Sequence, residues 1–106
     1  MNYLQDTFNS FVTRWQLGQV DAFADFATAV RDGAQGGTFS ETDGARALAA
    51  AMFVEGVDDD PLREEITIVA GDLETGQPTD TRHTWHYLSA LIDELGPRGR
   101  GELSKT

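Results

Sequence analysis

The sequence predicts an all-α fold, a compact single-domain bundle of about five short helices around a central alanine-rich helix. Two segments repeat apolar residues at the offsets 0, 4, 7, 8 and 11, the spacing of one face of an α-helix. The segment 45–54 is apolar at nine of ten positions, is mostly alanine and follows no single stripe, which is typical of a helix buried on several sides. A chain of 106 residues also fits one domain with one core.

The first two helices are expected to form an antiparallel hairpin. The first lies between Asn2, which can cap its start, and Gly18, which can close it. The second begins at Asp21, and a connection as short as 18–20 forces neighbouring helices to run antiparallel. The glycine-rich stretch 33–37 then predicts a flexible loop. The core-facing residues are Leu4, Phe8, Phe11, Val12, Trp15, Ala22, Phe23, Phe26, Ala29 and Val30.

The alanine-rich helix is expected to run from about Glu41 to Glu55. Ser40, with Asp43 three residues later, resembles a capping box, and acids in the first turn suit the helix dipole. Gly56 provides the C-terminal stop.

The next helix is expected from Pro61 to about Thr75. Asp60 can cap it, proline suits the first helical position, and Gly76 can end it. The local signals conflict, because residues 66–69 are rich in β-branched side chains. A short strand at 66–70, in an α+β fold, is therefore an alternative that needs a partner strand elsewhere.

The last helix is expected to begin after the turn 77–80 and to end at Gly96 and Pro97. Beyond it, Leu103 is the only large apolar residue among glycines and basic residues. The predicted organisation is therefore a helical domain at 1–96 and a flexible C-terminal tail at 97–106.

Composition narrows the classes of function. The chain has no cysteine, no signal-peptide pattern and no apolar run long enough to span a membrane, so we expect a cytoplasmic protein. Eighteen acidic residues against eight basic ones give a net charge of −10. Such a charge repels nucleic acid and anionic membranes and attracts basic protein surfaces, although acidity can also reflect adaptation to salt.

Two histidines are the only candidates for a metal site. His83 and His86 are three residues apart on one exposed helix face, with Asp80 and Asp93 nearby along the helix. Imidazole and carboxylate groups can hold zinc or nickel, but this spacing without a third firm ligand is common by chance. We therefore expect no cofactor, and a small metal-dependent or acid/base enzyme that uses these histidines is an alternative function.

Acidic residues are concentrated in one part of the chain. Between residues 55 and 74 there are eight acids and one base, Arg63. On the predicted helix Ile68 is framed by Glu64 and Asp72 on the outward face, a combination that suits binding to a basic surface. A merely solvated face has the same composition. The candidate partner-binding residues are Asp58, Asp59, Asp60, Glu64, Glu65, Ile68 and Asp72.

These observations favour a small acidic, non-enzymatic interaction protein that binds and blocks a basic protein, most plausibly one that handles nucleic acid. Phage inhibitors of host defence, such as anti-CRISPR proteins, and immunity partners of nuclease toxins are similar in size and charge. That likeness is one of bulk properties and covers no motif. A homodimeric accessory subunit, paired through the first helix and the alanine-rich helix, is a further alternative.

Overall fold

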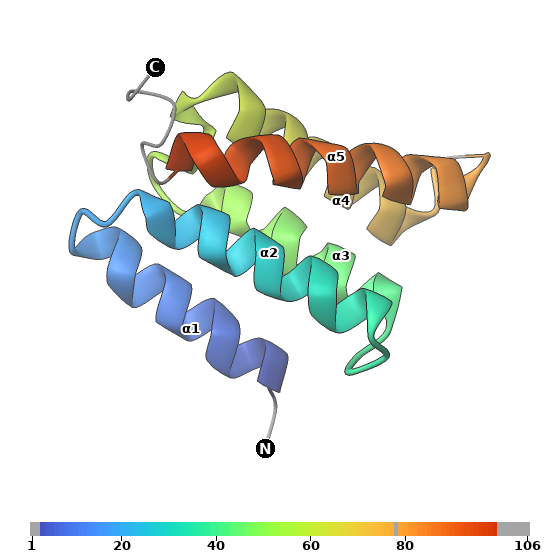
Figure 1. Cartoon of the computed structure of the whole chain (residues 1–106), viewed down its shortest axis with the longest axis horizontal. Coiled ribbons are helices and arrows are strands. Elements are labelled where there is room, and N and C mark those ends of the chain that lie inside the picture. Colours follow the sequence, from blue (N-terminus) through green and yellow to red (C-terminus); the bar gives the residue numbers. More distant parts are fainter. Residues whose placement is uncertain (1–2, 78, 100–106) are drawn as a thin grey trace.

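A computed structural model of the chain describes residues 3–77 and 79–99. The described chain is all-α, as predicted, and the segment 66–70 is helical, so the alternative of a strand there is wrong. In Figure 1 α1 and α5 lie at opposite edges of the bundle with α2 between them. The elements are α1 (Tyr3–Gln16), α2 (Asp21–Gln35), α3 (Glu41–Ala50), the short 3₁₀ helices η1 (Ala51–Phe53) and η2 (Val57–Asp59), α4 (Pro61–Thr75) and α5 (Thr81–Gly99).

The α1–α2 hairpin contains the aromatic part of the core. Gly18 has a φ of +85° and allows the tight turn between the two helices. Phe11 stacks on Phe26 with a centroid distance of 4.7 Å and meets Phe23 edge-on at 5.7 Å. The helix α2 packs against α1, α3 and α5 and has more buried residues than any other helix with described side chains.

The alanine-rich helix α3 lies among α1, α2 and α4. Ser40 caps it as predicted, because its hydroxyl accepts a hydrogen bond of 3.0 Å from the Asp43 amide. Ala45 and Leu48 are fully buried. The helix is shorter than predicted, however, since it ends at Ala50 and tightens into η1 before an extended residue at Val54.

The side of α3 and η1 that faces away from the core is open. Phe53 is 85% exposed and Met52 is 42% exposed, whereas Ala50 is only partly buried. The prediction that the segment 45–54 is buried on several sides is therefore wrong for Met52 and Phe53. The buried residues of the segment are Ala45, Leu48, Ala49 and Ala51. An apolar run that ends in a methionine and a phenylalanine reads the same whether those two residues are buried or exposed. The sequence pattern alone therefore did not show that Met52 and Phe53 lie at the surface.

The predicted loop at 33–37 begins three residues later than expected, at Gly36. Gly33 is buried inside α2, which continues to Gln35. Its missing side chain makes room for the ring of Phe39, which also stacks on Tyr3 with a centroid distance of 6.1 Å. Gly44 of α3 lies against the same ring, so two glycines and one phenylalanine set the approach of α2 and α3.

Gly33→Ala is expected to destabilise the fold although alanine is the better helix former. The new Cβ would lie 2.4 Å from Cζ of Phe39, so the ring has to leave its position between the helices. Such overpacking costs about 1–3 kcal/mol and exceeds the gain of about 1 kcal/mol in helix propensity. Urea denaturation measures the difference.

Gly71→Ala is the matched control, because Gly71 is also helical and its added Cβ would lie 3.9 Å from that of Ala49, an ordinary contact. We expect this variant to gain up to about 1 kcal/mol in the free energy of unfolding. Equal shifts of the two variants would contradict the role given to Phe39.

The helices α4 and α5 complete the bundle. Asp60 caps α4 by accepting hydrogen bonds from the Leu62 and Arg63 amides, and Gly76 ends it with a φ of +74°. On α5 the buried side chains are Trp85, Leu88, Ile92 and Leu95.

The last helix continues past its predicted end, because α5 extends to Gly99. Proline disfavours a helical conformation in the residue before it, but this preference does not end the helix here. Residues 97–99 of the predicted tail are therefore helical, and 100–106 lie outside the described residues.

Candidate partner-binding site

Three of the predicted partner-binding residues lie in a row on α4. Glu64, Ile68 and Asp72 follow one another at intervals of four residues, one helical turn each, and all three are exposed. The opposite face of α4 is buried against the bundle, which fixes the direction of this row. Ile68 is 45% exposed between two carboxylates.

The preceding segment adds two more acids at the start of α4. Asp58 and Asp59 are exposed on η2, while Val57 between them and the turn is fully buried. Gly56 has a φ of +92°, a conformation that glycine adopts without strain, and it turns the chain into η2. We call the residues Asp58, Asp59, Glu64, Ile68 and Asp72 the acidic face.

Arg63 holds this segment in place and does not neutralise its acids by an ion pair. Its guanidinium donates hydrogen bonds to the carbonyl oxygens of Val57 at 2.8 Å and Gly56 at 3.3 Å. It lies 5.1 Å above the ring of Trp15, whose indole N–H donates to the Glu55 carbonyl oxygen at 2.9 Å. The only base between residues 55 and 74 is thus used to fix the backbone.

The other predicted partner-binding residues have partners within the fold. Asp60 is the cap of α4, so its carboxylate is engaged by backbone amides. Glu65 accepts a hydrogen bond of 3.0 Å from the hydroxyl of Tyr87 on α5. We therefore assign both residues a structural role beside the acidic face.

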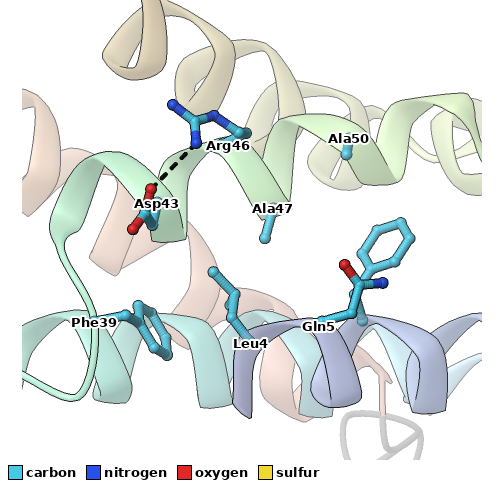
Figure 2. Close-up of a pocket in the computed structure, with 8 residues that line it drawn as sticks. Leu4, Gln5, Phe39, Asp43, Arg46, Ala47 and Ala50 are labelled. Carbon is cyan, nitrogen blue, oxygen red and sulfur yellow. Dashed lines mark hydrogen bonds and ion pairs between the residues drawn. The ribbon is translucent and has the colours of Figure 1, made fainter. Parts of the chain in front are cut away.

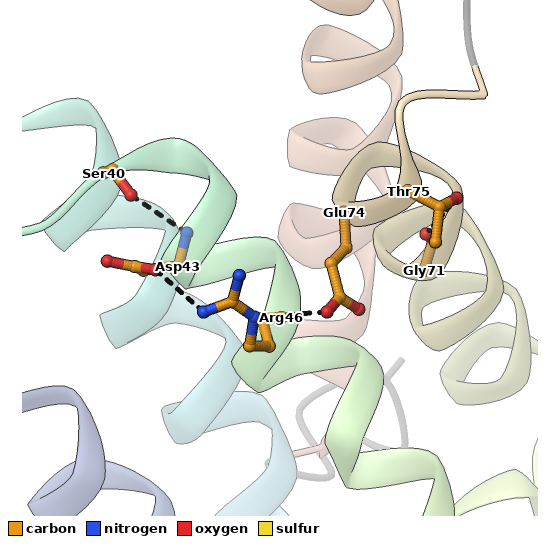
Figure 3. Close-up of polar contacts among 6 residues, drawn as sticks. All are labelled: Ser40, Asp43, Arg46, Gly71, Glu74 and Thr75. Carbon is orange, nitrogen blue, oxygen red and sulfur yellow. Dashed lines mark hydrogen bonds and ion pairs between the residues drawn. The ribbon is translucent and has the colours of Figure 1, made fainter.

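Three arginines neutralise acids in other parts of the molecule. Figure 3 shows one of these groups, in which Arg46 lies between Asp43 of its own helix, α3, and Glu74 of α4. Within residues 3–77 and 79–99, the four carboxylates of the acidic face form no ion pair. The acids paired elsewhere are Asp21 and Asp25 with Arg14, Asp32 and Asp93 with Arg31, and Asp43 and Glu74 with Arg46.

The contact of Tyr87 with Glu65 shifts the pKa of the tyrosine. The hydrogen bond to the carboxylate, with smaller contributions from desolvation and charge, raises the pKa of Tyr87 above its ordinary value. The neutral hydroxyl is thus the form that the folded state favours. Its contribution to stability is present below the unfolded pKa of about 10 and is lost as the pH rises through the raised pKa.

Glu65→Gln is expected to lower the pKa of Tyr87 toward the ordinary value, because it removes the charged acceptor. The chain has two tyrosines, so a Tyr3→Phe background leaves Tyr87 as the only one that titrates. The ultraviolet absorbance of tyrosinate across an alkaline titration gives the pKa. The same midpoint with and without Glu65 would show that the hydrogen bond is not formed in solution.

The structure does not bring a third ligand to the two histidines. His83 and His86 are exposed on α5, and the His83 amide donates a hydrogen bond to the Asp80 carboxylate, which caps the helix. His86 lines a depression of about 420 Å³ with Gln35 and Glu41. In the described part of the chain no three histidine or carboxylate side chains are grouped for a metal ion.

A groove between α1 and α3 was not predicted. It has a volume of about 430 Å³, and Figure 2 shows the side chains that α1 and α3 direct into it. The sequence places Leu4 and Phe8 on the core stripe of α1, but nothing in the pattern indicates that α3 leaves them partly uncovered. The lining residues are Leu4, Gln5, Phe8, Phe39, Asp43, Arg46, Ala47 and Ala50.

Comparisons with known proteins and a search for membrane spans give no further assignment. The chain matches no protein-family model, no curated protein and no solved structure. Over the described residues, no helix combines the length and the apolar character needed to cross a bilayer.

Proposed function

We propose that this protein binds a basic surface of a nucleic-acid-handling protein through the acidic face and blocks that surface. The observation that carries the proposal is the position of the acids that remain unpaired. Arg14, Arg31 and Arg46 pair with six acids of the described chain. The exposed acids of η2 and of the outward row of α4 form no ion pair there; they are Asp58, Asp59, Glu64 and Asp72.

Charge and apolar area have separate tasks in this interaction. Unpaired carboxylates attract a basic partner over distance and set its orientation. Ile68, framed by Glu64 and Asp72, offers apolar area that becomes buried on contact. The rigid attachment of η2 through Arg63 and Trp15 lowers the conformational entropy lost on binding.

A nucleic-acid-handling protein is the partner class that best fits this chemistry. Proteins that bind nucleic acid present clustered lysine and arginine side chains to the phosphates. A row of carboxylates one helical turn apart can occupy such a cluster, and the occupied cluster is no longer open to phosphates. Blocking therefore follows from occupancy and requires no catalytic group.

The proposal is tested by capture from the source cell's lysate with elution in steps of rising salt. We expect the wild type to retain a basic protein that moderate salt releases, and the double variant Glu64→Gln, Asp72→Asn to lose it. The matched control, Asp6→Asn with Glu94→Gln, removes two exposed acids from α1 and α5 and should capture as well as the wild type.

Blocking is tested separately on the captured protein. Added wild-type chain should displace a labelled oligonucleotide from it, and the Glu64→Gln, Asp72→Asn variant should not. Failure of the wild type to retain any basic protein at low salt would refute the proposed function.

A further inference from the structure

The most exposed aromatic side chain of the described region lies at the end of α3. Phe53 is 85% exposed and follows Met52, which is 42% exposed, while Phe11, Phe23 and Phe26 are buried in the core. Exposure of so large an apolar side chain on a well-packed bundle is typical of an interface residue. The acidic face does not include it.

The groove between α1 and α3 is a second feature of the surface outside the acidic face. The two helices run in the same direction, because Tyr3 stacks on Phe39 before α3 and Trp15 contacts Glu55 after it. Ala47 and Ala50 point from α3 toward the groove (Figure 2). Leu4 and Phe8 of α1 also line the groove.

Phe53 lies on the same side of its element as the groove-lining alanines. Ala47, Ala50 and Phe53 follow at intervals of three residues, and the 3₁₀ geometry of η1, with three residues per turn, keeps Phe53 in line with Ala50. The rise along the α3–η1 axis from Ala47 in the groove to Phe53 is therefore about 10 Å.

We propose that a second copy of this chain covers this side, with the two copies related by a two-fold axis beside Ala50. An isologous contact requires a surface that is complementary to itself. Turning one copy about that axis brings its Phe53 over Ala47 and into the groove of the other, and the reciprocal contact forms at the same time. Each groove is then completed by a residue that only the second copy supplies.

Charge favours a second copy over a basic partner at this surface. The charged groups that line the groove are Asp43 and Arg46, which form an ion pair with each other at 3.2 Å. Two chains of net charge −10 repel least where their surfaces are nearly neutral, so the acidic face is unsuited to self-association.

Sedimentation velocity over a wide range of protein concentration tests the dimer. We expect the wild type to shift from monomer to dimer, and Phe53→Asp to remain monomeric with an unchanged thermal midpoint of the dilute protein, because the replaced side chain is exposed. Ile68→Asp is the control, because it also replaces an exposed apolar side chain by aspartate but on the acidic face. This variant should dimerise like the wild type. A wild type that stays monomeric at high micromolar concentration would overturn the inference.

Crosslinking tests the position of the axis. The chain has no cysteine, so Ala50→Cys introduces a single thiol that should meet its own copy and form an intermolecular disulfide under mild oxidation. Ala90→Cys, on an exposed part of α5, should form much less. Equal crosslinking of the two variants would contradict the proposed axis.

The dimer does not depend on the proposed function, and the variants separate the two. Phe53→Asp should abolish dimers and still capture the basic partner, whereas Ile68→Asp should weaken capture and still dimerise. If Phe53→Asp instead abolished capture while the wild type sedimented as a monomer, the groove side would belong to the partner and the inference would be wrong.

Discussion

Ala45→Asp is expected to unfold the protein or to leave it barely stable. Ala45 is 0% exposed on α3, the helix that packs among α1, α2 and α4. An unpaired carboxylate at this position would lose its hydration without gaining an opposite charge, a cost of about 3–5 kcal/mol. Because small domains are stable by only about 5–15 kcal/mol, circular dichroism should show a thermal transition that is lost or shifted strongly downward.

Ala90→Asp is the matched control, since it makes the same substitution on an exposed part of α5. We expect a change of no more than about 0.5 kcal/mol in the free energy of unfolding. Comparable losses of stability in both variants would mean that α3 does not occupy the middle of the bundle.

Phe23→Ala is expected to cost about 3–5 kcal/mol, the range found when a buried phenylalanine is truncated. Phe23 is 0% exposed and meets the ring of Phe11 edge-on, with further aromatic contact to Phe26. Its removal leaves a cavity between α1 and α2 that a rigid hairpin with a tight turn cannot close. Urea denaturation at constant slope gives the loss directly.

Phe53→Ala serves as the control for Phe23→Ala, because the same side chain is removed from the surface. Measured on dilute protein, where dimers do not contribute, its free energy of unfolding should match that of the wild type. A large loss in this variant would contradict the exposed position of Phe53.

The helices could be predicted because their signals are local. Ser40 and Asp60 cap α3 and α4 as expected, and Gly18 and Gly76 provide the left-handed turns that were predicted to end α1 and α4. Caps and glycine turns depend on a few adjacent residues, so one sequence is enough to place them.

The features that were missed depend on tertiary contacts. Gly33 has the local character of a loop, but the ring of Phe39 needs the space above it and makes it a buried helical residue. The exposure of Phe53 depends on how η1 packs, because this turn buries Ala51 and leaves Met52 and Phe53 at the surface. Neither relation is encoded in the spacing of apolar residues along one segment.

The row of acids on α4 was predicted, but the partners of the neighbouring side chains were not. Helical spacing alone places Glu64, Ile68 and Asp72 together on one face. It could not show that Glu65 contacts Tyr87 or that Arg63 turns to the carbonyl oxygens of Gly56 and Val57. These partners are on other turns or other helices, and they decide which acids remain unpaired.

The measurement that tests the central claim most directly is a calorimetric titration of the purified partner at two salt concentrations. The wild type should bind more weakly as salt rises, and Glu64→Gln with Asp72→Asn should bind at least about tenfold more weakly at low salt, with a smaller dependence on salt. Asp6→Asn with Glu94→Gln should bind like the wild type. Equal losses in the two double variants would show that net charge, and not the acidic face, determines binding, and would contradict the account.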